Sequence, residues 1–185
     1  MEINNQHTLF EEVNEARNNY YEEHGKNRLF KTTQKNDLAN HVCNHFELQK
    51  MIQCTAYVIP NTYKLYFSYP LFKTYGSPEN CGAMSNYIKE VLIPMLLSSN
   101  SGFEMHVNLK GFTVSACHRF FSAIRWLFDE NTELTNRMIQ LHIYHTPAVI
   151  EQIRKLLYVC IKDVLEKITH HYKDSDECIA KLHNM

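Results

Sequence analysis

Residues 51–185 alternate between segments in which apolar residues recur at every second position and segments in which they recur at helical spacing. Segments 103–110 and 139–144 have the period of two, which is typical of a strand with one apolar and one polar face. Segments 114–128 and 147–165 have the helical spacing. Strands that alternate with helices form a largely parallel sheet joined by right-handed crossovers. The pattern therefore predicts an α/β fold.

A β-hairpin is expected before the first of these helices. Residues 52–59 and 63–72 are rich in aromatic and β-branched side chains, and Pro60-Asn61 between them is a turn signal. A short strand near Ile168 completes the sheet. We thus expect a mostly parallel five-stranded sheet with an N-terminal β-hairpin edge and flanking helices, preceded by an N-terminal helical arm.

The first fifty residues differ in composition from the rest of the chain. They are polar, rich in Asn, Glu and His, and poor in β-branched residues. Leu9 and Val13 have helical spacing and predict a short amphipathic helix near 8–23. We therefore divide the chain into an N-terminal polar helical arm, residues 1–50, and a second domain, residues 51–185.

Charge and glycine content exclude several classes of function. Nineteen basic and twenty acidic residues give a net charge of -1, so the basic excess of a non-specific nucleic-acid binder is absent, and we expect no nucleic-acid partner. None of the five glycines forms G-x-G, which excludes the P-loop and the dinucleotide fingerprint. The G-x-S-x-G and H-E-x-x-H motifs are also absent. We expect a protein that is not an enzyme and has no catalytic residue and no cofactor.

The N-terminus and the cysteines predict the compartment. The first residues lack the basic start and apolar run of a secretory signal, and no apolar stretch is long enough to span a bilayer. None of the six cysteines forms a C-x-x-C pair, which favours reduced thiols. We expect a cytoplasmic protein, with peripheral contact to membranes left open.

The chain contains eleven histidines, which are common metal ligands. His41 and His45 would share a helix face, but Cys43 points away from that face, so these three residues cannot close a zinc site alone. Glu104 and His106 share a strand face and could form an acid/base pair, but no nucleophile or metal partner was identified for them. We expect no bound metal.

Two sequence motifs, each followed by a predicted helix, occur in the second domain. Residues 107–112 read VNLKGF and precede a predicted helix, and residues 137–147 read RMIQLHIYHTP and precede a long apolar helix and Glu166-Lys167-Ile168. Together they resemble the CRAL-TRIO lipid-binding domain, whose pattern is a strand ending in D-L-K-G, a helix, a strand ending in A-P, a gate helix and a K-I strand. The resemblance covers about residues 51–183 and is still closer to the divergent BCH-like branch of that family.

The resemblance implies a sheet that forms the floor of a pocket for one lipid, with a gate helix over its mouth. The matching gate is about residues 148–165. Lys167 matches the lysine that meets the head-group phosphate in phosphatidylinositol-transfer members, whereas Asn136 stands where those members have glutamate. The function implied is non-catalytic binding of a lipid or other small hydrophobic ligand in a gated pocket, with transfer or presentation at membranes. The expected ligand-binding residues are Tyr66, Ser68, His106, His142, Tyr144, Ile150, Ile153, Leu157, Ile161 and Lys167.

The polar faces of the strands leave a second function open. A lipid cavity is usually lined by apolar side chains, yet one face of each central strand carries residues such as Glu104, His106 and His142. A semi-polar ligand, or no ligand, would fit such a face. The alternative is a BCH-like protein–protein interaction scaffold of the small-GTPase signalling type, which binds a protein partner or forms a homodimer without lipid.

Overall fold

The computed structural model describes residues 3–98, 101–129, 132–165 and 168–183. It contains a five-stranded mixed sheet whose spatial order follows the sequence, from β1 to β5. The first two strands pair antiparallel and the others pair in parallel. This confirms the expected α/β fold with a hairpin at one edge. The strands are β1 (Ala56–Val58), β2 (Lys64–Ser68), β3 (Phe103–Asn108), β4 (Met138–Tyr144) and β5 (Ile168–His171).

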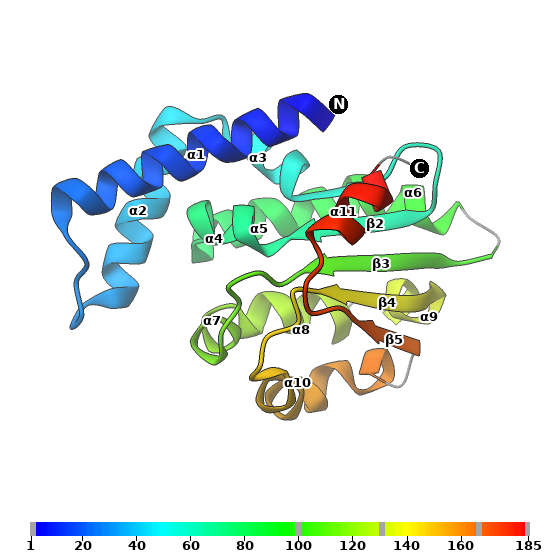
Figure 1. Cartoon of the computed structure of the whole chain (residues 1–185). Helices are drawn as coiled ribbons and strands as arrows, with labels where there is room; N and C mark the ends of the chain where they lie inside the picture. The colour runs from blue at the N-terminus through cyan, green and yellow to red at the C-terminus, as the bar shows by residue number, and fades with distance from the viewer. Residues whose placement is uncertain (1–2, 99–100, 130–131, 166–167, 184–185) are drawn as a thin grey trace.

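The strand order explains why the crossover helices gather on one side. When parallel strands are added in one direction and every crossover is right-handed, all crossovers lie on the same face of the sheet. Figure 1 shows α5 and α8 behind the strands. The crossover elements are α4 (Tyr69–Tyr75), α5 (Pro78–Tyr87), the π-helical turn η1 (Ile88–Leu92), α6 (Ile93–Leu97), α7 (Val114–Arg119), α8 (Phe121–Asp129), α9 (Thr132–Arg137) and α10 (Ile150–Leu165).

The two faces of the sheet differ in chemistry because one of them receives these crossovers. We call the covered side the crossover face; it carries Leu65, Phe67, Met105, Val107, Leu141 and Ile143. The other side is the polar face; it carries Lys64, Tyr66, Ser68, Glu104, His106, Asn108, Gln140, His142 and Tyr144. Helix α11 (Asp176–His183) lies on the polar face, in front of the strands in Figure 1, where its Leu182 packs with Tyr66 and Tyr144.

The first fifty residues supply part of the main core. Helix α1 (Ile3–His24) buries Leu9 and Val13, and helix α2 (Lys31–His45) buries Leu38 and Val42. These side chains belong to the same apolar cluster as residues of the sheet. The expected helix near 8–23 is therefore present and longer, and the domain boundary at residue 50 stays a prediction.

Several element boundaries differ from those expected. Residues Leu48–Thr55 form helix α3, so the strand expected at 52–59 is limited to β1. The next strand ends at Ser68 because Pro70, which has no N–H for the ladder, lies in the first turn of α4. The helix expected at 114–128 breaks at Phe120, whose φ of −104° and ψ of 13° interrupt the helical backbone.

In the part of the chain that the structure describes, no helix is both long and apolar enough to cross a membrane. The five cysteines whose side chains are described form no disulfide with one another.

Candidate functional site

A cavity of about 170 Å³ lies between the crossover face and helices α8 and α10. Val107 and Ile143 form its floor on adjacent strands, and Arg154 of α10 is the one charged residue along its described walls. The Arg154 guanidinium is partly exposed and lies 3.1 Å from the Glu151 carboxylate. The other lining side chains are apolar or aromatic, among them Phe67, Ile124, Phe128, Ile150, Ile153 and Leu157.

Local sequence explains how α10 lines this cavity. Ile150, Ile153 and Leu157 recur at intervals of three and four, so they share one face of the helix. That face turns toward the sheet, because Ile153 and Leu157 are buried whereas Tyr158 is 53% exposed. The helix thus covers the cavity on the side away from the sheet. The side chain of Ile161 and the whole of Lys167 lie outside the described residues.

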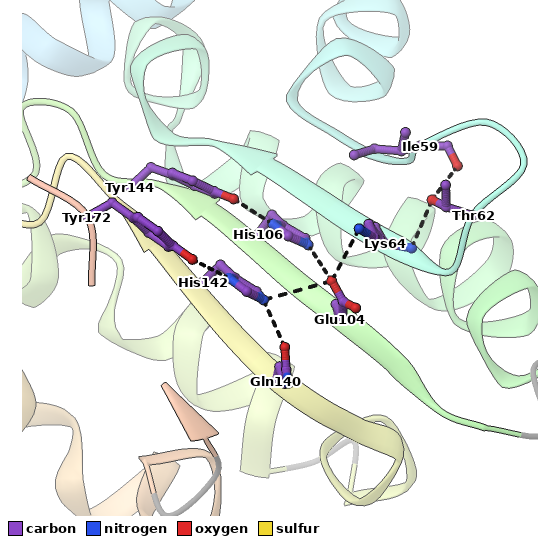
Figure 2. A network of polar contacts seen from close by, with 9 residues as sticks. All are labelled: Ile59, Thr62, Lys64, Glu104, His106, Gln140, His142, Tyr144 and Tyr172. Carbon is purple, nitrogen blue, oxygen red and sulfur yellow. Dashed lines mark hydrogen bonds and ion pairs between the residues drawn. The ribbon is translucent and has the colours of Figure 1, made fainter. Parts of the chain in front are cut away.

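A cluster of histidine and glutamate side chains lies on the polar face, on the other side of the sheet from the cavity (Figure 2). The register places His106 of β3 opposite His142 of β4, and Glu104 lies two residues before His106 on the same face. Glu104 Oε2 is 3.1 Å from Nε2 of His106 and 3.8 Å from Nε2 of His142. Lys64 Nζ is 3.6 Å from the same carboxylate oxygen, and Gln140 Oε1 is 3.2 Å from Nε2 of His142. Glu104 Oε2 and the Nε2 atoms of His106 and His142, three atoms with lone pairs that could bind a metal ion, therefore converge from two neighbouring strands.

Each histidine of this cluster is oriented by a tyrosine on its other side. Nδ1 of His106 lies 2.9 Å from the Tyr144 hydroxyl, and Nδ1 of His142 lies 3.1 Å from the Tyr172 hydroxyl. The two imidazole rings stack with centroids 4.4 Å apart and planes 4° from parallel. His170 stacks on the other side of His142 at 4.8 Å. Hydrogen bonds and stacking together hold the two rings nearly parallel.

Burial sets the protonation of the rings. Burial, with the neighbouring His142, lowers the pKa of His106 to about 4 despite the nearby Glu104 carboxylate. Burial also lowers the pKa of His142, and His170 adds to this shift. Both imidazoles are therefore neutral near pH 7. Burial raises the pKa of the Tyr144 hydroxyl, so this group is a neutral hydrogen-bonding partner.

The structure does not gather the predicted site residues in one place. Tyr66, Ser68, His106, His142 and Tyr144 lie on the polar face, whereas Ile150, Ile153 and Leu157 line the cavity on the crossover face. The sheet separates the two sets. Burial raises the pKa of Tyr66 to about 12, and its hydroxyl accepts a hydrogen bond of 3.3 Å from the Asn108 amide. Tyr66 packs against Leu182 of α11.

Several residues near these sites were not selected from the sequence. Phe128 and Arg154 line the cavity, and Gln140 and Tyr172 contact the histidine cluster. The spacing of Glu104 and His106 signalled a shared face, but their closeness to a second histidine depends on the register of β3 against β4. Sequence spacing alone does not specify that register.

The loop between α1 and α2 presents an apolar tip. Leu29 is 87% exposed and Phe30 is 66% exposed. Asn27 Oδ1 accepts the backbone N–H groups of both residues at 2.9 Å, and Asn27 N donates to Gln34 Oε1 at 2.8 Å. These bonds hold the loop in shape while both apolar side chains face solvent. A surface hollow beside this tip is lined by Arg17, Tyr21, Lys26, Asn27, Arg28, Lys31, Gln34 and Lys35.

Comparison of the chain with protein-family models, with curated proteins and with solved structures gave no match. The apolar cavity, the histidine–carboxylate cluster and the apolar loop tip are therefore interpreted from their own geometry.

Proposed function

We propose that this protein binds a small hydrophobic or amphiphilic molecule between the crossover face and α10. The observation that carries the proposal is the cavity of about 170 Å³ with almost wholly apolar walls. Apolar cavities of roughly 150 Å³ lined by Leu, Ile and Phe stay dry and bind apolar molecules such as benzene. The resemblance of segments 107–112 and 137–147 to the CRAL-TRIO domain supports the same function, with α10 in the place of the gate.

The size and charge of the cavity favour a particular class of ligand. Pockets that enclose a drug-sized molecule measure roughly 300–1,000 Å³, so this cavity accommodates the end of an acyl chain rather than a whole phospholipid. Arg154 on the cavity wall offers its guanidinium to an anionic head group. A single-chain fatty acid matches both, because its acyl chain can enter the cavity and its carboxylate can pair with Arg154. A larger ligand would require α10 to move outward.

Outward movement of α10 supplies a route for the ligand. The helix is held on the sheet by buried apolar side chains, among them Ile153, Leu157 and Val164. Exposing them to water would be unfavourable by about 1.5–3 kcal/mol for each fully buried side chain, so opening is expected where an apolar environment replaces water. A membrane surface provides such an environment.

Filling the cavity should prevent ligand binding. We expect Val107→Phe to weaken dodecanoate binding by about tenfold or more, because the added ring occupies the volume that the acyl chain would fill. Binding can be measured by isothermal titration calorimetry with delipidated protein.

A matched variant separates occupancy of the cavity from general strain. Val114 packs against the core at the start of α7 but does not line the cavity. Val114→Phe should therefore bind dodecanoate as the wild type does. Equal binding by the Val107→Phe and wild-type proteins, or equal loss in both variants, would contradict the proposed site.

The apolar loop tip supports membrane contact. Leu29 and Phe30 are the two most exposed large apolar side chains of the described residues, and basic residues adjoin them. Apolar insertion together with basic attraction is the combination that holds proteins at anionic lipid surfaces. We expect a Leu29→Ser/Phe30→Ser variant to lose most of its sedimentation with vesicles containing phosphatidylserine.

Another exposed residue serves as the control for membrane contact. Met95 is 49% exposed on α6, and Met95→Ser should sediment as the wild type does. If the wild type does not sediment with vesicles and instead self-associates through Leu29 and Phe30, the loop functions in protein–protein interaction rather than in membrane contact.

A further inference from the structure

We infer that Glu104, His106 and His142 form a binding site for one divalent transition-metal ion, with Zn²⁺ as the ion to test. One ligand atom from each of the three residues lies within 4.8 Å of the other two. This site is on the polar face and is independent of the hydrophobic cavity. Its ligands come from two paired strands, so their separation is set by the sheet.

The distances fit an ion of this kind. Zinc binds imidazole nitrogen and carboxylate oxygen at about 2.0–2.2 Å, which places two ligands of a tetrahedral ion about 3.3–3.5 Å apart. Glu104 Oε2 lies 3.1 Å from Nε2 of His106 and 3.8 Å from Nε2 of His142. Shifts of a few tenths of an ångström would bring Glu104 Oε2 to these separations from both nitrogens. The two rings stack 4° from parallel, so one ring must also rotate to turn its Nε2 lone pair toward the same ion.

The surroundings also match a metal site. Metal-binding histidines usually donate their second ring N–H to a neighbouring acceptor, which fixes the tautomer and turns the other lone pair toward the ion. Nδ1 of His106 faces the Tyr144 hydroxyl and Nδ1 of His142 faces the Tyr172 hydroxyl, so each ring can bind metal through Nε2 (Figure 2). Each histidine thus has a tyrosine hydroxyl beside Nδ1 and a side-chain oxygen beside Nε2.

The ligand set selects among metals. Two imidazoles and one carboxylate suit Zn²⁺ and neighbouring transition ions, whereas Mg²⁺ and Ca²⁺ prefer oxygen ligands. Three protein ligands leave a fourth position for water or for Gln140, whose Oε1 is 3.2 Å from Nε2 of His142. Glu104 is partly exposed, so the ion can reach the site from solvent.

Lys64 provides a distinctive test of charge. Its Nζ lies 3.6 Å from Glu104 Oε2 and balances the carboxylate without metal. A divalent cation at this position would be repelled by the ammonium group. Lys64→Met should therefore tighten Zn²⁺ binding severalfold, whereas a merely structural hydrogen-bond network would show no such gain.

The experiment is a titration of the full chain, stripped with a chelator, against Zn²⁺ in competition with a chromophoric chelator. We expect one Zn²⁺ per chain and a loss of affinity of about tenfold or more in Glu104→Gln and in His142→Ala. Circular dichroism will show that each variant is folded. The conservative Glu104→Gln variant keeps the test decisive if His142→Ala does not fold.

A second histidine pair supplies the control. His41 and His45 on α2 have ring centroids 4.6 Å apart and could bind Zn²⁺ adventitiously. His45→Ala should leave the affinity unchanged if the proposed site is correct. The inference is overturned if the wild type binds no Zn²⁺, or if His45→Ala removes binding while folded Glu104→Gln retains it.

Discussion

Replacing Gly102 with alanine is expected to destabilise the protein by about 3 kcal/mol or more, because backbone strain and a steric clash act together. Gly102 has φ of +84°, which L side chains rarely adopt. A Cβ at this position would lie 2.5 Å from the backbone oxygen of Arg137 and 2.9 Å from Cγ2 of Ile139. The clash falls where β3 begins beside β4, so relief would disturb the centre of the sheet.

The same substitution elsewhere should have the opposite effect. Gly82 lies inside α5, and a Cβ there meets nothing within 4 Å. Gly82→Ala is expected to stabilise the protein by about 0.5–1 kcal/mol, because alanine loses less conformational entropy in a helix. Urea denaturation followed by circular dichroism measures both variants. Similar changes in the free energy of unfolding for Gly102→Ala and Gly82→Ala would contradict the close packing around Gly102.

Truncation of Leu38 is the second large effect. Leu38 on α2 is 2% exposed and belongs to the apolar cluster that includes the sheet. Leu38→Ala should lower the free energy of unfolding by about 2–5 kcal/mol, the range for buried leucines. Because the cluster is continuous, we expect the whole protein to unfold in one transition at lower urea concentration.

Leu29 provides the matched control, because it is 87% exposed in the loop just before α2. Leu29→Ala should change stability by less than about 0.5 kcal/mol, as is usual for surface positions. A separate early transition in Leu38→Ala, with the main transition unchanged, would instead show that residues 1–50 fold as an independent unit.

The fold could be predicted where the hydrophobic period was clear. Strict alternation located β3 and β4, and the helical spacing of apolar residues located α10. The same reasoning was wrong for residues 52–55, where a short apolar run is compatible with either a strand or a helix. Burial of Met51 and Ile52 against the core favours α3 there, and no local signal distinguishes the two structures.

The candidate sites were only partly accessible to sequence reasoning. The period of two shows that His106 shares the polar face with Glu104 and that the opposite, apolar face is the one for helices. The predicted polar residues therefore lie on the far side of the sheet from α10, not in the cavity beneath it. The approach of His142 to Glu104 depends on strand register, which is a property of the folded sheet.

The cavity beneath α10 should hold the apolar part of a ligand. The most direct measurement is anomalous diffraction from crystals of the protein grown with 12-bromododecanoate, whose bromine marks the end of the chain. We expect a bromine peak among Phe67, Ile143 and Leu157, with the carboxylate toward Arg154. Bromine bound elsewhere, with the cavity empty at saturating ligand, would contradict it.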